Sequence, residues 1–316
     1  MNITVLMSVY NGEKHLKEAI DSILNQTYKD FEFIIVNDGS IDNSEKIILG
    51  YKDKRIKYIK RENGGLSAAL NTGLFVAKGE YIARMDADDI SYKDRLQKQL
   101  DFMKKNKDIV ALGAGITYME ENGEQIFSYV NKMTPKEIRA NILKRCPIAH
   151  PTVFYRRDIA IKCGGYYEKI KQYFEDHLLF KKMLEYGDLY NLNESLLNYR
   201  LVSTSITSNK EFRKEYLSIR QRVLINEYIS DEDQKKLIEI KNHGNRNLKF
   251  KKSKYHLYLG KLYLWRNANK KKSRRNLKLS LQYHFSIKTF VLYLLTLFPS
   301  STVISIYNFL DKRRNS

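Results

Sequence analysis

The chain has 316 residues, of which 43% are hydrophobic, 4 are proline and 15 are glycine. This composition excludes a disordered or collagen-like chain, and the length allows an α/β domain of about 200 residues with a smaller appendage. The net charge of +20 is unevenly placed, since Asp311 is the only acidic residue after Glu239. A tail of this kind is attracted to an anionic surface.

The cysteines and the first residues indicate the compartment. Cys146 and Cys163 have neither CxxC spacing nor histidine partners in register, so neither a zinc site nor a disulfide scaffold is expected. The segment Met1–Leu6 begins a strand pattern without a basic leader, an apolar signal core or a cleavage site. We therefore expect a cytoplasmic protein in a reducing compartment.

The first part of the chain alternates strand and helix patterns. Apolar, β-rich runs predict strands, and apolar residues at helical spacing or capping residues predict helices. In chain order the expected elements are strand 3–9, helix 13–25, strand 31–36, a helix capped by Asp42, strand 56–59, helix 66–71 and strand 81–85. This alternation predicts an α/β, Rossmann-like domain with a mostly parallel sheet flanked by helices.

Further elements follow before the composition changes. They are a helix over 91–106 with Ser91 and Asp94 in capping-box spacing, a hairpin turn at Asn122-Gly123, a helix opened by Thr134-Pro135, strand 152–155 and a helix beginning at Glu175-Asp176. The composition shifts near Asn209. We expect an α/β domain over 1–208 and a basic, aromatic-rich helical region over 209–316.

The acidic tetrad, Asp86-Ala87-Asp88-Asp89, follows the apolar strand 81–85. Crowded carboxylates repel one another, and a hard cation such as Mg²⁺ or Mn²⁺ would neutralise them together with the phosphates it carries. The alternative is a solvated loop that caps the next helix. Because ligands on such sheets bind outside the carboxyl ends of the strands, the loops at 10–12, 37–40 and 86–89 should line one crevice.

Several short motifs occur in a fixed order along the first part of the chain. They are Val5–Asn11, Val36–Ser40, Glu62–Leu66, Asp86–Asp89, His150–Thr152, Glu175-Asp176 and Tyr199-Arg200. With these motifs the first 205 residues or so resemble the family 2 glycosyltransferases, nucleotide-sugar enzymes with the GT-A fold. The segment Arg84–Asp89 resembles the capsule and exopolysaccharide branch of that family.

The resemblance implies an inverting, metal-dependent transfer from a UDP-sugar. The residues expected to bind the donor nucleotide are Ser8, Tyr10, Glu13, Asp38, Asn63, Asp86 and Arg200. Asp86 and Asp88 would hold Mn²⁺ or Mg²⁺, whose charge stabilises the departing diphosphate. A buried Asp38 could select uracil through its imide N–H, although Asn-Asp-Gly-Ser is also typical of a turn. For Arg200, the alternative is a structural ion pair.

Transfer also requires a general base, because an acceptor hydroxyl is barely acidic. The resemblance assigns this role to Asp176, with Glu175 as the alternate, since neighbouring carboxylates raise one another's pKa. Stabilisation by the helix dipole is the alternative explanation for both residues. His150 is expected on the acceptor side, and a structural role is the alternative for a lone histidine.

The basic tail has two functional explanations. Lysine, arginine and aromatic residues interleave over 241–278, which suits nucleic acid or an anionic membrane surface. The apolar stretch 290–310 favours the membrane, and its interruption at Pro299 predicts a monotopic or re-entrant hairpin, flanked by Lys288 and Lys312–Arg314. An ordinary helical subdomain with a basic solvated face is the remaining alternative.

The resemblance implies a hexosyl- or N-acetylhexosaminyltransferase of bacterial surface polysaccharide synthesis. It would act on a lipid-linked or oligosaccharide acceptor, as a peripheral or monotopic protein at the inner face of the cytoplasmic membrane, without nucleic acid as a partner. The alternatives are a nucleotidyltransferase of related fold and a basic nucleic-acid-binding protein. Short motifs do not choose the sugar, because hydroxyl discrimination depends on pocket groups.

Overall fold

The computed structural model describes residues 2–170, 173–203, 213–245, 248–299, 302–303 and 305. The chain divides into two compact units. The first unit comprises residues 1–117, 128–199 and 215–235, and the second comprises 118–127, 200–214 and 236–316. The boundary predicted between residues 208 and 209 lies outside the described residues.

Nine strands among the described residues form one mixed sheet, in the order β3-β2-β1-β4-β8-β6-β9-β5, with β7 paired to β6. They are β1 (Ile3–Val9), β2 (Phe31–Asp38), β3 (Ile56–Arg61), β4 (Tyr81–Asp86), β5 (Ile90–Ser91), β6 (Ile109–Met119), β7 (Gln125–Tyr129), β8 (Phe154–Arg156) and β9 (Asp188–Arg200). Strands β1 to β4 pair in parallel, whereas β8 pairs antiparallel with β4 and β6. The predicted α/β class with a mostly parallel sheet is confirmed.

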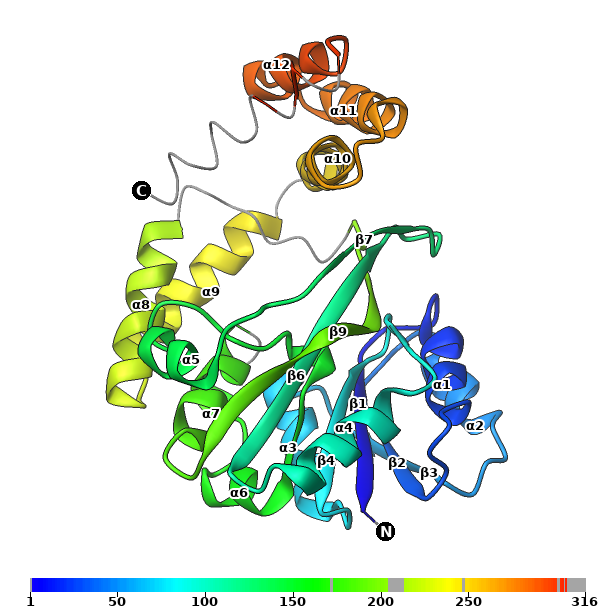
Figure 1. Cartoon of the computed structure of the whole chain (residues 1–316), viewed down its shortest axis with the longest axis vertical. Coiled ribbons are helices and arrows are strands. Elements are labelled where there is room, and N and C mark those ends of the chain that lie inside the picture. The colour runs from blue at the N-terminus through cyan, green and yellow to red at the C-terminus, as the bar shows by residue number, and fades with distance from the viewer. Residues whose placement is uncertain are drawn as a thin grey trace. The chain divides into compact units, whose positions relative to one another are not determined.

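The helices alternate with the strands in the first part of the chain and dominate the last part (Figure 1). They are α1 (Leu16–Leu24), α2 (Ser44–Leu49), α3 (Leu66–Val76), α4 (Arg95–Lys105), α5 (Pro135–Asn141), α6 (Arg157–Lys162), α7 (Glu175–Met183), α8 (Arg213–Asn226), α9 (Asp231–Asn245), α10 (Leu248–Trp265), α11 (Lys270–Tyr283) and α12 (Ile287–Leu295). Two short 3₁₀ turns, His150–Thr152 and Glu168–Ile170, lie between β7 and α7.

Both faces of the central strands are covered, because every residue of β2 is buried. On one face, apolar side chains of β1, β2 and β4 pack with those of α3, α5, α6 and α7 in a single cluster. The side chains that alternate to the other face of the sheet are also buried, Val5 and Met7 among them. The carboxyl ends of the parallel strands are therefore held in fixed register.

Two predicted elements differ from the structure, and one predicted cap is confirmed. The helix expected over 91–106 begins only at Arg95, because Ser91 is buried in β5, where it pairs with Leu197. The prediction of a capping box formed by Ser91 and Asp94 was therefore wrong. The strand expected over 152–155 is β8, which follows a 3₁₀ turn. At α5, Thr134 caps the helix as predicted and forms a capping box with Glu137, since each residue accepts the other's backbone N–H.

In the second unit, α11 packs against both α10 and α12 (Figure 1). The helices share a small apolar core that includes Leu257, Leu277 and Leu292. A side chain at Gly260 of α10 would place its Cβ 2.6 Å from Leu277, so glycine permits the close approach of α11. The predicted turn at Asn122-Gly123 joins β6 to β7, with a φ of +90° at Gly123.

The apolar stretch predicted as a membrane hairpin is described only in part. Residues 290–295 of this stretch belong to α12 (Ile287–Leu295), while 300–301, 304 and 306–310 lie outside the described residues. Within the described ranges, we find no helix with the length and hydropathy required to cross a bilayer.

Candidate active site

The ends of three parallel strands meet, as the sequence predicted. Ser8 of β1 lies opposite Asp86 of β4 on one side and Val36 of β2 on the other. The loops that follow β1 and β2 are joined by hydrogen bonds: the Gly12 N–H donates to Ser44 Oγ at 2.9 Å, and the Glu13 N–H donates to Asp42 Oδ2 at 2.9 Å. One rigid edge of the sheet is thereby formed.

Two residues expected at the donor nucleotide lie in the loop after β1. Tyr10 is 54% exposed, so its ring faces solvent beyond the end of the strand. The carboxylate of Glu13 accepts hydrogen bonds from the backbone N–H and the side-chain amide of Asn43, at 3.0 and 2.7 Å. Glu13 therefore holds the two loops together, and its contact with a nucleotide stays a prediction.

Asp38 is buried at the end of β2 and holds the loop before α3. Its Oδ1 accepts the Gly64 N–H at 3.0 Å, and its Oδ2 accepts the Gly65 N–H at 2.8 Å. The side-chain amide of Asn63 donates to the Asp38 carbonyl oxygen at 3.0 Å. Asp38 and Asn63 thus shape this edge of the site, which gives Asp38 a structural role beside the one predicted on uracil.

The acidic tetrad forms the turn between β4 and β5. One carboxylate oxygen each from Asp86, Asp88 and Asp89 lies within 4.8 Å of the others. Asp89 is buried and the other two are partly exposed. Hard carboxylate oxygens at this spacing fit Mg²⁺ or Mn²⁺. Because α4 begins at Arg95, Asp89 does not cap a helix at Ser91, and it joins the two predicted ligands as a third candidate.

Arg84, two residues before the tetrad, is a site residue that the sequence analysis did not single out. Its guanidinium is buried, and its Nη1 donates to Asp86 Oδ2 at 2.5 Å. Arg95 is also buried and donates to the Arg84 carbonyl oxygen at 2.7 Å. Burial, together with the nearby Arg84, lowers the pKa of Arg95 to about 9. The sequence did offer one signal for a special role of Arg84, because it is a charged residue inside the otherwise apolar run 81–85.

The second carboxylate group is the pair Glu175 and Asp176 in the first turn of α7. Burial, followed by the charge of Asp176, raises the pKa of Glu175 to about 8. Burial also raises the pKa of Asp176, which is less covered than Glu175. Burial thus favours the protonated form of Glu175, the residue predicted as the alternate base, over its charged form.

Asp176 also has structural contacts. Its Oδ1 accepts the His177 N–H at 2.7 Å, and Cys146 Sγ lies 3.6 Å from its Oδ2. These contacts fix the orientation of the carboxylate at the beginning of α7. They are compatible with the helix-dipole explanation as well as with a catalytic role, and the assignment stays a prediction.

His150 lies beside this pair. Its Nε2 is 3.1 Å from the hydroxyl of Tyr166, and its Nδ1 is 3.7 Å from Glu175 Oε1. Burial, with the charge of Arg84, lowers the pKa of His150 well below its usual value, so the imidazole is neutral. Arg84 also opposes the rise in the pKa of Asp176. The buried guanidinium of Arg84 thus contacts the tetrad and also acts electrostatically on the carboxyl pair Glu175-Asp176.

Arg200 is the last residue of β9 and belongs to the second unit. Its Nη1 donates to the carbonyl oxygen of Glu121 at 2.8 Å, so its guanidinium supports the β6–β7 hairpin. This contact gives Arg200 a structural role, and the ion pair considered as an alternative stays open. A contact between Arg200 and a donor phosphate stays a prediction.

These features define an α/β enzyme with two carboxylate groups, and the family follows from sequence comparison. A sequence profile described as "Glycosyl transferase family 2" matches residues 4–164, just over half of the chain. The chain belongs to glycosyltransferase family 2 and is a glycosyltransferase. The matched segment contains the tetrad and His150 and ends before Glu175. This assignment excludes the nucleotidyltransferase alternative.

Among its relatives is the "O-antigen biosynthesis glycosyltransferase WbnJ" of Escherichia coli, 39% identical over 220 residues, which span 64% of this chain and 81% of that protein. An uncharacterized glycosyltransferase of Methanocaldococcus jannaschii is 42% identical over 174 residues, which span 53% of this chain and 60% of that protein. The chain thus spans most of the first relative and less than two thirds of the second.

Solved structures agree with the GT-A fold. S. aureus TarS 1–349 in complex with UDP-GlcNAc superposes with a TM-score of 0.56 at 20% identity, over 98% of this chain and 92% of that one. The mannosyltransferase PcManGT of Pyrobaculum calidifontis, in complex with GDP-Man and Mn²⁺, gives 0.55 at 15% identity, over 98% and 84%. At these identities the likeness establishes the fold alone.

Proposed function

We propose that the chain is an inverting glycosyltransferase that moves a sugar from a UDP-sugar to a glycan acceptor of a bacterial surface polysaccharide. The observation that carries the proposal is the presence of two carboxylate groups in one unit. The tetrad stands at the joined ends of the parallel strands, and the pair Glu175-Asp176 stands at the beginning of α7. The first group suits a metal-bound diphosphate, and the second suits removal of a proton.

On the donor side, Tyr10 and Asp38 contact the base, with Ser8, Glu13 and Asn63 shaping the same edge of the sheet. Asp86 would lie near the ribose, and Asp86 and Asp88 would hold Mn²⁺ or Mg²⁺. When bound, the cation supplies positive charge that stabilises the departing diphosphate. The metal ion in the PcManGT complex and the UDP-GlcNAc in the TarS complex support these assignments by analogy.

On the acceptor side, Asp176 accepts the proton of the attacking hydroxyl. The hydroxyl oxygen forms the new bond to the anomeric carbon while the bond to the UDP oxygen breaks on the opposite face, which inverts the configuration. Glu175 keeps its proton at neutral pH, because burial raises its pKa to about 8. The negative charge of the pair is therefore concentrated on Asp176, and the neutral His150 lies beside it on the acceptor side.

The transferred group is a hexose or an N-acetylhexosamine, and the acceptor is a lipid-linked or oligosaccharide glycan. The printed function of WbnJ, O-antigen biosynthesis, supports an acceptor of this class. A lipid-linked acceptor is found at the inner face of the cytoplasmic membrane. The protein would then work as a peripheral enzyme at that surface.

Calorimetry with a nucleotide panel tests the proposal. UDP, GDP, UDP-GlcNAc, UDP-glucose and UDP-galactose are titrated with Mn²⁺ and again with a chelator. We expect UDP and at least one UDP-sugar to bind, with a marked loss of affinity when the metal is removed. A preference for GDP would overturn the choice of base, and failure of every nucleotide to bind would overturn the donor site.

A further inference from the structure

Helix α12 has one buried face and one exposed apolar face. Thr289, Leu292 and the C-cap residue Thr296 are buried, and Leu292 packs in the apolar core that α12 shares with α10 and α11. On the opposite side, Ile287, Phe290, Val291 and Leu294 follow the spacing i, i+3, i+4, i+7 and so share one face of the helix. Their exposed fractions run from 38% at Leu294 to 75% at Ile287, which is high for large apolar residues.

The exposed stripe extends beyond both ends of α12. Phe285 precedes the helix, is 66% exposed, and its ring lies 6.3 Å from that of Phe290. Leu297 and Phe298 follow the helix and are 57% and 51% exposed. We call these residues the α12 apolar face: Phe285, Ile287, Phe290, Val291, Leu294, Leu297 and Phe298. A continuous apolar surface of this kind marks a binding surface more often than an incidental exposure.

A basic stripe runs along α11. Lys271, Arg274, Arg275 and Lys278 are exposed and follow the same i, i+3, i+4, i+7 spacing. We call these four residues the α11 basic stripe. Arg274 donates to the carbonyl oxygen of Thr296 at 2.9 Å, and the preceding Lys270 donates to that of Phe298, also at 2.9 Å. These bonds place the beginning of the stripe next to the end of the α12 apolar face.

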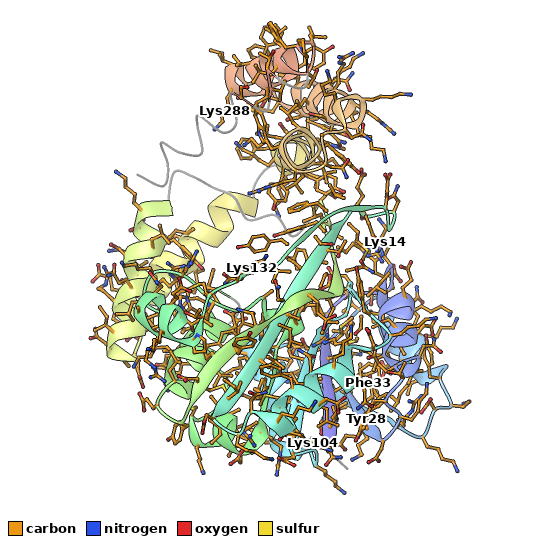
Figure 2. The ribbon with its side chains drawn as sticks, viewed as in Figure 1. Lys14, Tyr28, Phe33, Lys104, Lys132 and Lys288 are labelled. Carbon is orange, nitrogen blue, oxygen red and sulfur yellow. The ribbon has the colours of Figure 1, made fainter. Side chains whose placement is uncertain are left out.

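The chain segment that carries this surface has charges of a single sign. The sequence contains no aspartate or glutamate between Glu239 and Asp311. Lys288 lies on α12 itself, directly after Ile287 of the α12 apolar face (Figure 2). Apolar side chains beside basic ones match the interface of an anionic bilayer, where the chains enter the acyl boundary and the cations meet lipid phosphates.

We propose that the α12 apolar face and the α11 basic stripe dock the second unit on the surface of an anionic membrane, with α12 lying in the interface. Nucleic acid would use the basic stripe but would leave the aliphatic side chains Ile287, Val291 and Leu294 in water. A second copy of the chain would have to bring an equally basic surface against this one. The bilayer is the occupant that satisfies both features.

Flotation of the full chain with phosphatidylcholine vesicles, with and without phosphatidylglycerol, tests the proposal. We expect binding only to the anionic vesicles, weakened by high salt. Val291→Ser/Leu294→Ser should reduce binding more than about tenfold, because two apolar side chains no longer enter the lipid. Arg275→Gln/Lys278→Gln should reduce it by about tenfold or more.

Matched controls lie in the first unit. Phe75→Ser/Val76→Ser changes two apolar residues that are 54% and 51% exposed on α3. Lys104→Gln/Lys105→Gln changes two exposed lysines on α4, of which Lys104 is labelled in Figure 2. Both controls should float like the unaltered protein. Far-ultraviolet circular dichroism of each variant verifies folding, so that a loss of flotation reports the surface.

Three outcomes would overturn the proposal. The first is unchanged flotation of the Val291→Ser/Leu294→Ser variant. The second is a dimer in sedimentation that this variant converts to a monomer, which would assign the face to a second copy. The third is binding of a single-stranded oligonucleotide that both variants weaken, with no binding to vesicles. Donor binding by calorimetry is a separate readout, so the membrane proposal and the transferase proposal fail independently.

Discussion

Each unit places some side chains in an energetically unfavourable environment, but the two units do so with different kinds of side chain. The first unit buries charge: the guanidiniums of Arg84 and Arg95 and the carboxyl of Glu175 are almost fully removed from water. The second unit instead leaves large apolar side chains of α12 in water. Buried charge alters protonation and orients reacting groups, whereas exposed apolar surface favours association. We therefore infer chemistry in the first unit and attachment in the second.

Among the variants that test this comparison, removal of a proposed metal ligand should have the largest effect, a loss of transferase activity. We expect Asp88→Ala to abolish turnover of the UDP-sugar, by about 10³-fold or more, because the departing diphosphate loses its stabilising charge. The assay measures release of UDP as Mn²⁺ is varied. Asp101→Ala, an exposed carboxylate on α4, is the matched control. Full activity of Asp88→Ala in the presence of a chelator would contradict the metal assignment.

The proposed base gives the next largest effect. We expect Asp176→Asn to lower the transfer rate by about 10²- to 10⁴-fold while donor affinity is retained, because the amide cannot accept the proton. Single-turnover transfer and calorimetry separate the two quantities. Asp158→Asn, an exposed residue on α6, should leave both unchanged. Undiminished transfer in Asp176→Asn would place the base elsewhere.

The sequence predicted the edge of the sheet well and its electrostatics poorly. Strands β1, β2 and β4 were recognisable because buried parallel strands are continuous apolar runs, and parallel pairing brings their carboxyl ends together. The same pattern could not assign Arg84, whose partner Asp86 becomes evident only when the side chain is seen buried. The pairing of His150 with Tyr166 spans 16 residues and depends on how the chain returns to the site.

The end of the chain was predictable in composition but not in geometry. Charge and apolar content indicated a surface-binding region, yet the division of α12 into one buried and one exposed apolar face depends on its contact with α11. At Ser91 the local capping signal was overridden, because its hydroxyl accepts a hydrogen bond from the buried Gln26 and its backbone joins β5. Tertiary contacts decided both cases.

A smaller effect is expected in the pH dependence of stability. The raised pKa of Glu175 means that the folded state holds a proton that the unfolded state releases above a pKa of about 4.5, so this residue lowers stability as pH rises from there to about 8. His177, whose pKa is lowered to about 4, acts in the opposite direction, but only below its unfolded value of 6.5. Between pH 6.5 and 8 the carboxyl pair therefore governs the slope.

Glu175→Gln tests this assignment, since glutamine resembles the protonated form. Urea unfolding at pH 5, 6.5 and 8 should give similar stabilities for variant and unaltered protein at pH 5, and a variant more stable at pH 8, on the order of 2 kcal/mol. Glu185→Gln, at an exposed carboxylate, should follow the unaltered protein at each pH. If the unfolding free energies of Glu175→Gln and of the unaltered protein changed with pH in the same way, a raised pKa at this residue would be refuted.

The smallest expected effect is on the stability of the second unit, where two neighbouring arginines should differ in their contribution to folding. Arg274 donates from Nε to Thr296 Oγ1 at 3.1 Å and from Nη2 to the Thr296 carbonyl oxygen at 2.9 Å, and so supports the C-terminal end of α12. Arg274→Gln should cost about 1 kcal/mol, because these bonds to the end of the helix are lost. Arg275→Gln, at the exposed neighbour, should leave thermal unfolding unchanged and weaken only vesicle binding. Equal melting temperatures for the two variants would mean that the basic stripe does not support α12, and its lysines and arginines would then serve attachment alone.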